Sequence, residues 1–289
     1  MDPVESAESA RRVAAMFDLV SETYDTVSVP WFSPIAATLV ECVAPRPGER
    51  ALDLGTGRGA ALWPLAEGVA PGGSVTAVDI SRQMIEATRR AVAERDLDSV
   101  ELHVMDAGAP ELPLGVYDVA VASLVLFFLP DPPAALRSWC RLLSPGGRLG
   151  LSTFAARDAE WEDLDDVFTG YLPPTLLDAR TSGGRGPFAS DDGVVGLLTG
   201  CGFVDVVTDC RDLRVHFTGV AQWRDWTWSH GQRSHWLAVP EERRGDVLAD
   251  AAARLEPILD PDGGFTLTQC VRYTTARRPQ GTAGPVRVE

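Results

Sequence analysis

Hydrophobic positions follow two different spacings along the chain. Short apolar runs rich in Val, Leu and Ala predict five strands, at residues 51–54, 74–80, 100–104, 117–122 and 148–154. Between them, apolar residues recur at helical spacing and predict helices at residues 60–69, 82–95 and 132–143. Because strands and helices alternate through this region, it predicts an α/β domain with a doubly wound parallel sheet.

The flanking segments predict additions to this sheet. Val13, Phe17, Val20 and Tyr24 share one face of a helix predicted over residues 4–24, and a second helix is predicted over residues 34–43. A helix over 191–201 and strands over 203–217 and 265–276 follow the core. We therefore divide the chain into a helical cap (1–48), a core (49–156), lid insertions that also complete the sheet (157–276) and a tail without regular structure (277–289).

The first strand ends in a glycine turn, Ala-Leu-Asp-Leu-Gly-Thr-Gly-Arg-Gly-Ala over residues 51–60. Such a strand–turn–helix junction brings the backbone and the helix-start N–H groups close to a ligand. The spacing G-x-G-x-G differs from the dinucleotide fingerprint G-x-G-x-x-G. Asp53, two residues before Gly55, would repel a pyrophosphate but accept hydrogen bonds from an ammonium group. The turn therefore favours a zwitterionic, sulfonium-bearing cofactor over NAD.

The next strands also end in chemically useful residues. Asp79, at the tip of the second strand, can accept both hydroxyls of a ribose, while Ile80 and Met84 can flank a base. Asp106 and Ala107 follow the third strand, and residues 122–124 follow the fourth. Because parallel strands carry ligands at their carboxyl ends, we expect these positions to share one site. His103 lies inside the third strand, and we interpret it as a strand side chain rather than a catalyst.

Residues 51–154 resemble the cofactor-binding half of class I S-adenosylmethionine (SAM) methyltransferases, on the motif Asp-Leu-Gly-Thr-Gly-Arg-Gly and the strand-end positions above. Phe-Asp-Leu-Val-Ser-Glu-Thr-Tyr-Asp (17–25) is similar to the ubiquinone/menaquinone-type branch. Residues 24–34, 124–132 and 228–233 resemble aklanonic acid methyltransferase-type proteins of actinobacterial polyketide pathways. The resemblance implies a Rossmann-like, mostly parallel seven-stranded sheet with an antiparallel last strand.

The resemblance also implies a cofactor and a reaction. It implies SAM as cofactor, Asp106 near the adenine amino group, and methyl esterification of a carboxylate on an aromatic polyketide. Many small-molecule relatives carry His-His where this chain has Phe127 and Phe128, so no catalytic histidine is expected there. The predicted cofactor site consists of Tyr24, Asp53, Gly55, Thr56, Gly57, Asp79, Ile80, Met84, Asp106, Ala107 and Ser123.

A segment rich in Trp, His and Arg, residues 223–236, offers two interpretations. Its tryptophans are ordinary helix packing, or they form the wall of a pocket for a flat aromatic substrate. In the second case Arg233 could hold a carboxylate, and His230 could act as the base for a phenol or position a carboxylate. The predicted catalytic residues are thus His230 and Arg233. The predicted substrate-binding residues are Trp31, Phe32, Phe127, Trp223 and Trp226.

Two further segments leave alternatives open. Residues 17–32, which we name the flap, are either a static cap on the core or a cover that closes over the cofactor with Tyr24 near its methionine end. The acidic run 158–166 is expected to be a solvated helix face, followed by a loop up to residue 192.

The composition of the chain excludes or disfavours several classes of function. The net charge of −15 disfavours nucleic-acid binding, and the complete absence of lysine excludes Schiff-base chemistry. Five scattered cysteines without a C-x-x-C disfavour a metal cluster and disulfides, which suits a reducing cytosol. Without a signal peptide or long apolar run, we expect a cytoplasmic protein that binds no membrane. The sequence leaves both a monomer and a homodimer open.

The sequence therefore predicts a SAM-dependent methyltransferase that transfers a methyl group to an oxygen, carboxylate or phenol, of a small aromatic or polyketide-derived metabolite. The alternative is a SAM-binding enzyme of a natural-product pathway that does not methylate, such as a decarboxylase, hydroxylase or cyclase. A dinucleotide oxidoreductase and a non-catalytic partner protein are disfavoured by Asp53 and by the retained strand-end positions.

Overall fold

A computed structural model describes residues 3–172 and 186–280. Its seven strands form one sheet in the order β3-β2-β1-β4-β5-β7-β6, in which β7 is antiparallel to both of its neighbours and the other pairs are parallel. The strands are β1 (Arg50–Leu54), β2 (Ser74–Asp79), β3 (Val100–Val104), β4 (Tyr117–Ser123), β5 (Leu143–Arg157), β6 (Val204–Phe217) and β7 (Phe265–Arg277). This confirms the predicted fold class, including the antiparallel last strand.

Helices cover both faces of the sheet. They are α1 (Pro3–Val20), α2 (Phe32–Val43), α3 (Leu62–Val69), α4 (Arg82–Ala93), α5 (Pro132–Leu142), α6 (Ala159–Asp166), α8 (Asp191–Gly200), α9 (Val220–Ser229), α10 (Arg233–Ala238) and α11 (Arg244–Leu255). Alternation along β1 sets the two cores: Ala51 packs with α2 and α3, whereas Leu52 and Leu54 pack with α5 and α8.

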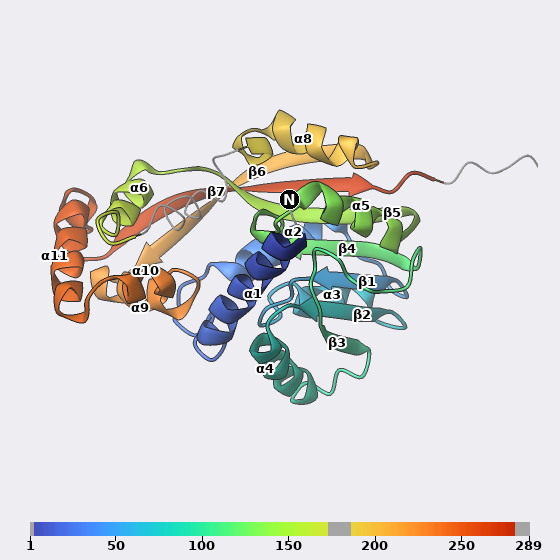
Figure 1. Cartoon of the computed structure of the whole chain (residues 1–289), viewed down its shortest axis with the longest axis horizontal. Coiled ribbons are helices and arrows are strands. Elements are labelled where there is room, and N and C mark those ends of the chain that lie inside the picture. Colours follow the sequence, from blue (N-terminus) through green and yellow to red (C-terminus); the bar gives the residue numbers. More distant parts are fainter. Residues whose placement is uncertain (1–2, 173–185, 281–289) are drawn as a thin grey trace, which may run out of the picture.

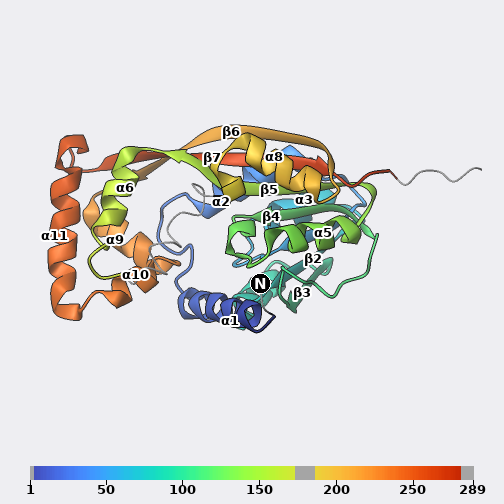
Figure 2. The same ribbon diagram turned by 45° about the horizontal axis from the view of Figure 1, so that its top comes forward.

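A group of four helices (α6, α9, α10 and α11), named here the helical group, lies beyond one end of the sheet. Figure 1 shows that the long strands β6 and β7 run from the sheet to this group, and Figure 2 shows the same arrangement from another direction. The sequence pattern did not predict α9, α10 and α11 as separate helices. Trp223, Trp226 and Trp236 of α9 and α10 are buried in the same hydrophobic cluster as residues of α2 and β7.

Element boundaries differ from the predicted ones for identifiable reasons. Helix α1 ends at Val20 rather than residue 24, because the hydroxyls of Ser21 and Thr23 donate to the carbonyls of Asp18 and Val20 and favour a turn. The predicted tail begins too early: Arg277 closes β7. Residues 281–289 lie outside the described residues, and so does much of the loop predicted before residue 192. The domain boundaries stay predictions.

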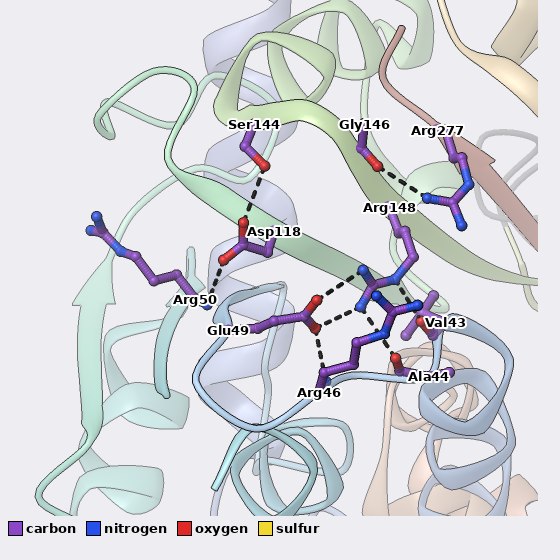
Figure 3. A network of polar contacts seen from close by, with 10 residues as sticks. All are labelled: Val43, Ala44, Arg46, Glu49, Arg50, Asp118, Ser144, Gly146, Arg148 and Arg277. Atoms are coloured by element: carbon purple, nitrogen blue, oxygen red, sulfur yellow. Dashed lines mark hydrogen bonds and ion pairs between the residues drawn. The ribbon is translucent and has the colours of Figure 1, made fainter. Parts of the chain in front are cut away.

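A partly buried arginine, Arg148 at the start of the parallel part of β5, holds the amino ends of the strands (Figure 3). Its guanidinium forms a two-point ion pair with Glu49, with N–O distances of 3.0 and 2.6 Å, and donates to the carbonyls of Val43 and Ala44 at 2.8 and 3.2 Å. Ala44 ends α2 in the left-handed conformation, with φ of 46°. Arg148 therefore connects the end of α2, the start of β1 and the start of β5.

A second contact at this edge runs through Asp118 of β4. Its two carboxylate oxygens accept from the backbone N–H of Arg50 at 3.0 Å and from the hydroxyl of Ser144 at 3.2 Å (Figure 3). Together the two contacts hold β1, β4 and β5 in register at the edge opposite the site described below.

The Arg148–Glu49 pair should contribute pH-dependent stability. Burial raises the pKa of Glu49, but the hydrogen bonds from Arg148 outweigh this effect and hold the pKa below its ordinary value. The contribution is therefore complete above that ordinary value and is lost as the pH falls through the lowered pKa. Glu49→Gln should reduce the free energy of unfolding by about 1–3 kcal/mol at pH 7, measured in urea.

The exposed Glu41 supplies the matched control. Glu41→Gln should leave the free energy of unfolding nearly unchanged. The gap between wild type and Glu49→Gln should narrow below pH 4, and a gap that stays constant down to pH 3 would contradict the stabilising role of the ionised pair.

Candidate active site

A cavity of about 670 Å³ opens at the carboxyl ends of β1, β2 and β4. Gly55, Asp79 and Ser123 supply its sheet side, while residues of α1, the flap and the helical group supply the rest. In Figure 1, α1 lies between α4 and the helices α9 and α10, across this space. The volume falls within the usual range for small-molecule sites.

The glycine turn gives the cavity a backbone floor. Gly55 has φ of 76°, and a Cβ there would lie 2.5 Å from Cγ2 of Val125. Gly57 has φ of 52° and open space where a Cβ would lie. The left-handed conformation at both positions favours glycine, and the second position leaves room for a ligand to approach the main chain.

Asp53 lies just behind this floor, fully buried at the end of β1. Burial raises its pKa to about 7, with a further rise from Asp79 and a lowering from the Thr56 hydroxyl. Within the described residues, neither Asp53 Oδ2 nor Thr56 Oγ1 has a hydrogen-bond partner of ordinary geometry. Both residues lie one layer below the cavity surface, since neither is among its described lining residues.

Asp79 lines the cavity at the end of β2 and is 7% exposed. Its two oxygens accept from the backbone N–H groups of Gly57 and Ser81, each at 2.8 Å. Burial raises its pKa to about 6 even though these two hydrogen bonds lower it. Each oxygen keeps further acceptor capacity, which suits the two hydroxyls of a ribose.

The other predicted cofactor residues also lie around the cavity, and they are Tyr24, Ile80, Met84, Asp106, Ala107 and Ser123. Tyr24 stacks on Phe32 with ring centroids 4.5 Å apart, and burial, followed by Asp25 and Asp79, raises the pKa of its phenol. Asp106 accepts from the N–H of Gly108 at 2.7 Å, which fixes its carboxylate at the cavity rim.

Aromatic rings form much of the remaining cavity wall. Of the predicted substrate residues, Trp31, Phe32, Phe127 and Trp226 line it. The ring of Trp31 lies between those of Phe154, Trp161 and Trp226, with centroid distances of 5.2 to 5.7 Å. Phe154 and Trp161 were not among the predicted substrate-binding residues. The position of Phe154 near the end of the fifth strand could have indicated that it lies at the site, whereas nothing in the acidic run indicated this for Trp161.

His230 lines the aromatic part of the cavity and is 9% exposed. The backbone N–H of Gln232 donates to its Nδ1 at 3.4 Å, so the neutral ring carries its proton on Nε2. Burial, followed by His235, lowers the pKa of His230 to about 3. At neutral pH it is thus a hydrogen-bond donor and a weak base.

Two residues predicted for the acceptor side do not reach the cavity. Arg233 directs its guanidinium to the carbonyls of Trp228 and Leu19 and to the hydroxyl of Thr23, so the prediction that it points toward the acceptor is wrong. Trp223 is 1% exposed and packs on other rings of the helical group. For Trp223 the packing interpretation holds, because its ring lies against Phe168 and Trp236 and does not line the cavity.

The expectation of a solvated acidic face is corrected at Asp165, which is 7% exposed and lines the cavity. Its carboxylate accepts from Arg157 at 2.8 Å and from the amide of Gln232 at 2.9 Å. Arg157 and Gln232 line the cavity too, so one part of its wall is polar and hydrogen-bonded.

Two further findings on the described residues concern metal sites and membrane-spanning helices. No cluster of three or more His, Cys, Asp or Glu side chains within those ranges has a geometry suited to a metal ion. Among the same residues, no helix has both the length and the apolar composition needed to cross a bilayer.

Comparison with known proteins identifies the family. A profile described as "Methyltransferase domain" matches residues 52–151. The chain is 35% identical to nocamycin O-methyltransferase of Saccharothrix syringae over 92% of this chain and 99% of that protein. The chain belongs to the class I SAM-dependent methyltransferases. It is also 39% identical to aklanonic acid methyltransferase DauC of Streptomyces sp. (strain C5), over 58% of this chain and 76% of that protein.

Solved structures share the fold of this methyltransferase. The [4+2]-cyclase SpnF matches with a TM-score of 0.59 and 21% identity, over 94% of this chain and 97% of that one. A Haemonchus contortus phosphoethanolamine N-methyltransferase in complex with SAM matches with a TM-score of 0.57 and 17% identity, over 91% of this chain and 57% of that one.

The residues at the strand ends fit SAM, the cofactor of this family. Asp53 holds an unpartnered buried oxygen beside the glycine turn, where an ammonium group would compensate its charge. Asp79 offers both oxygens to the ribose, and the open space at Gly57 admits the methionine end. SAM is the methyl donor of the methyltransferase, and these positions are the ones proposed to hold it.

Binding of SAM should be linked to deprotonation of Asp53. Because the pKa of this carboxyl is about 7 in the free protein, the group is about half protonated at pH 7, and a cation nearby favours the charged form. Calorimetry at pH 7 in buffers of different ionisation enthalpy should show release of about half a proton, and the affinity should fall as the pH drops below about 7. Asp53→Asn removes this group and should reduce the release. Equal proton release in the two proteins would contradict the assignment.

The ribose assignment has a separate test. Asp79→Ala removes both acceptor oxygens and should weaken SAM binding by about 1.5–3 kcal/mol, the range for hydrogen bonds with a charged partner. The exposed Asp98 provides the control, and Asp98→Ala should bind SAM like wild type. Unchanged affinity in the Asp79 variant would remove Asp79 from the cofactor site.

Proposed function

We propose that this methyltransferase transfers the SAM methyl group to a carboxylate oxygen of a small, flat, polyketide-type metabolite. The observation that carries the proposal is the single cavity in which the strand-end acids and glycines continue directly into a wall of aromatic rings. Broad, rigid rings such as Trp31, Phe127 and Trp226 offer a large contact area to a fused-ring substrate. The names of the two relatives, a nocamycin O-methyltransferase and an aklanonic acid methyltransferase, support the same substrate class.

The main task of the protein in this reaction is to align the methyl donor with the acceptor. SAM supplies an electrophilic methyl group on a sulfonium, so the protein has to hold an oxygen nucleophile in line with it. The cofactor half fixes one reactant through the acids of β1 and β2, and the aromatic half holds the other. Trp31 and Phe32, on the flap, belong to the wall beside both halves and help to exclude water.

The properties of His230 favour a carboxylate over a phenol as the nucleophile. A phenol with a pKa near 10 needs a base at neutral pH, whereas a carboxylic acid is already ionised. His230 is the predicted base that lines the cavity, yet its pKa of about 3 makes it a poor proton acceptor. Its Nε2–H instead suits a hydrogen bond to an oxygen of the acceptor. We therefore assign His230 to positioning the acceptor and not to proton removal.

The test is a methyl-transfer assay with a matched acceptor pair. An anthraquinone carboxylic acid and the corresponding hydroxyanthraquinone are incubated with SAM, and mass spectrometry follows S-adenosylhomocysteine and the methylated product. The proposal predicts a base-labile methyl ester of the acid and little ether from the phenol. Ether formation alone would overturn the choice of nucleophile. Product without S-adenosylhomocysteine would support the non-methylating alternative.

The role of His230 gives a quantitative prediction. His230→Asn should raise KM for the acceptor and change kcat by less than about threefold at pH 7.5, because no general base is lost. A lost base would lower kcat by about 10²–10⁴-fold. His103, on β3 and outside the cavity lining, supplies the control: His103→Asn should match wild type in both constants. A fall of kcat by 100-fold in the His230 variant alone would restore the phenol mechanism.

Two broader expectations accompany this function. We infer from the sequence that the enzyme works in the cytoplasm, and we propose that it forms a homodimer. Size-exclusion chromatography with light scattering measures the second directly.

A further inference from the structure

We propose that Arg233 is a positioning residue that latches the flap over the boundary between the cofactor and acceptor halves, and so sets how fast a ligand leaves the cofactor site. The proposal rests on SAM binding by this family and not on the choice of acceptor. It assigns a role to the residue that the sequence had placed in substrate binding.

The guanidinium of Arg233 donates three hydrogen bonds. Nε donates to the carbonyl of Trp228 at 2.6 Å, Nη1 to the carbonyl of Leu19 at 2.9 Å and Nη2 to the hydroxyl of Thr23 at 2.5 Å. Two of these three acceptors belong to the flap and its adjoining helix end. Among the described residues Arg233 forms no ion pair, so its charge is stabilised by these neutral oxygens. Hydrogen bonds from a charged donor are the strong ones.

The same end of the flap has other contacts with the helical group. Thr23 Oγ1 also lies 3.2 Å from the carbonyl of Ser229, and the amide of Gln222 donates to the carbonyl of Ser28 at 3.3 Å. Arg233 is the charged member of this set. Thr23 is shared between two of the contacts, which makes the Arg233–Thr23 pair the centre of the latch.

The same short stretch of the flap is also anchored to the cofactor half. Asp18 accepts from the hydroxyl of Ser81 at 2.6 Å and from the N–H of Gln83 at 3.1 Å, at the start of α4 and next to Asp79. Arg58, in the glycine turn, donates to the carbonyl of Ser21 at 2.6 Å. Residues 18–23 of the flap are therefore held by the cofactor motifs on one side and by the helical group on the other.

The flap also forms part of the cavity wall, through Phe17, Tyr24, Trp31 and Phe32. The segment that carries the latch does so as well, since His230, Gln232, Ser234 and His235 line the cavity on either side of Arg233. A ligand that packs against both segments stabilises the latched arrangement. By linkage, the latched arrangement then binds that ligand more tightly. Loss of the latch should thus speed both opening of the free flap and ligand release.

Two variants and one control test the latch. Arg233→Met keeps much of the aliphatic stem and removes all three donors, whereas Thr23→Val removes the hydroxyl with little change in shape. Arg244→Met is the matched control, because Arg244 also lies over the Trp228 ring, at 5.3 Å, and donates to the carbonyl of Trp236, yet its described contacts do not include the flap.

Two readouts are used, both without acceptor. Hydrogen exchange of residues 17–32 is measured in the free protein, and the dissociation rate of S-adenosylhomocysteine is measured by stopped-flow tryptophan fluorescence. Arg233→Met should raise both by about 10- to 100-fold, the equivalent of losing charged hydrogen bonds, and Thr23→Val should raise them by a smaller factor. In the double variant, the Thr23 change should add less than it does alone.

The control separates a latch from ordinary packing. Arg244→Met should destabilise the helical group without changing flap exchange or the dissociation rate. The proposal is overturned if Arg233→Met and Arg244→Met behave alike, or if neither readout changes in the folded Arg233 variant. Should Arg233→Met fail to fold, Thr23→Val decides alone, and wild-type rates in that variant reject the latch. Failure of the acceptor proposal would leave all these measurements unaffected.

Discussion

The site depends on the placement of two carboxylates, Asp53 and Asp79, in the dry carboxyl edge of the sheet. Neighbouring parallel strands end there together, so Asp79 lies close enough to Asp53 to disfavour its charge. Burial raises both pKa values. The left-handed glycine turn between the two acids adds backbone N–H groups, while Arg58 of that turn donates to the carbonyl of Ser21 instead. The free protein therefore holds uncompensated negative charge that a cationic ligand relieves, a common property of functional sites.

The remaining parts of the molecule position the residues around this edge of the sheet. The Arg148 contacts fix the opposite ends of the strands, so the acids have a rigid base. The long strands β6 and β7 carry the helical group out past the sheet (Figure 1). Its Trp161 and Trp226 line the same cavity as the strand ends. The flap joins the two parts, and its contacts with Ser81 and with Arg233 place one chain segment across the place where methyl donor and acceptor must meet.

The sequence predicted what local patterns determine. Strand runs and glycines at left-handed positions specify their own structure, and parallel topology then brings Asp79 and Asp106 to one cavity. The direction of a side chain in an irregular region depends on distant partners instead. Arg233 turns to Thr23, which lies 210 residues away, and Asp165 in an acidic run turns to Arg157 and Gln232. No spacing within the segment contains that information.

A crystal structure with S-adenosylhomocysteine and an aromatic carboxylic acid tests the central claim most directly. We expect the ribose hydroxyls on Asp79, the adenine beside Asp106, the amino group near the Asp53 side of the glycine turn, and the sulfur facing a carboxylate oxygen held between Trp31 and Trp226. A nucleoside bound among the aromatic rings, or an acid bound outside the cavity, would contradict the assignment of the two halves.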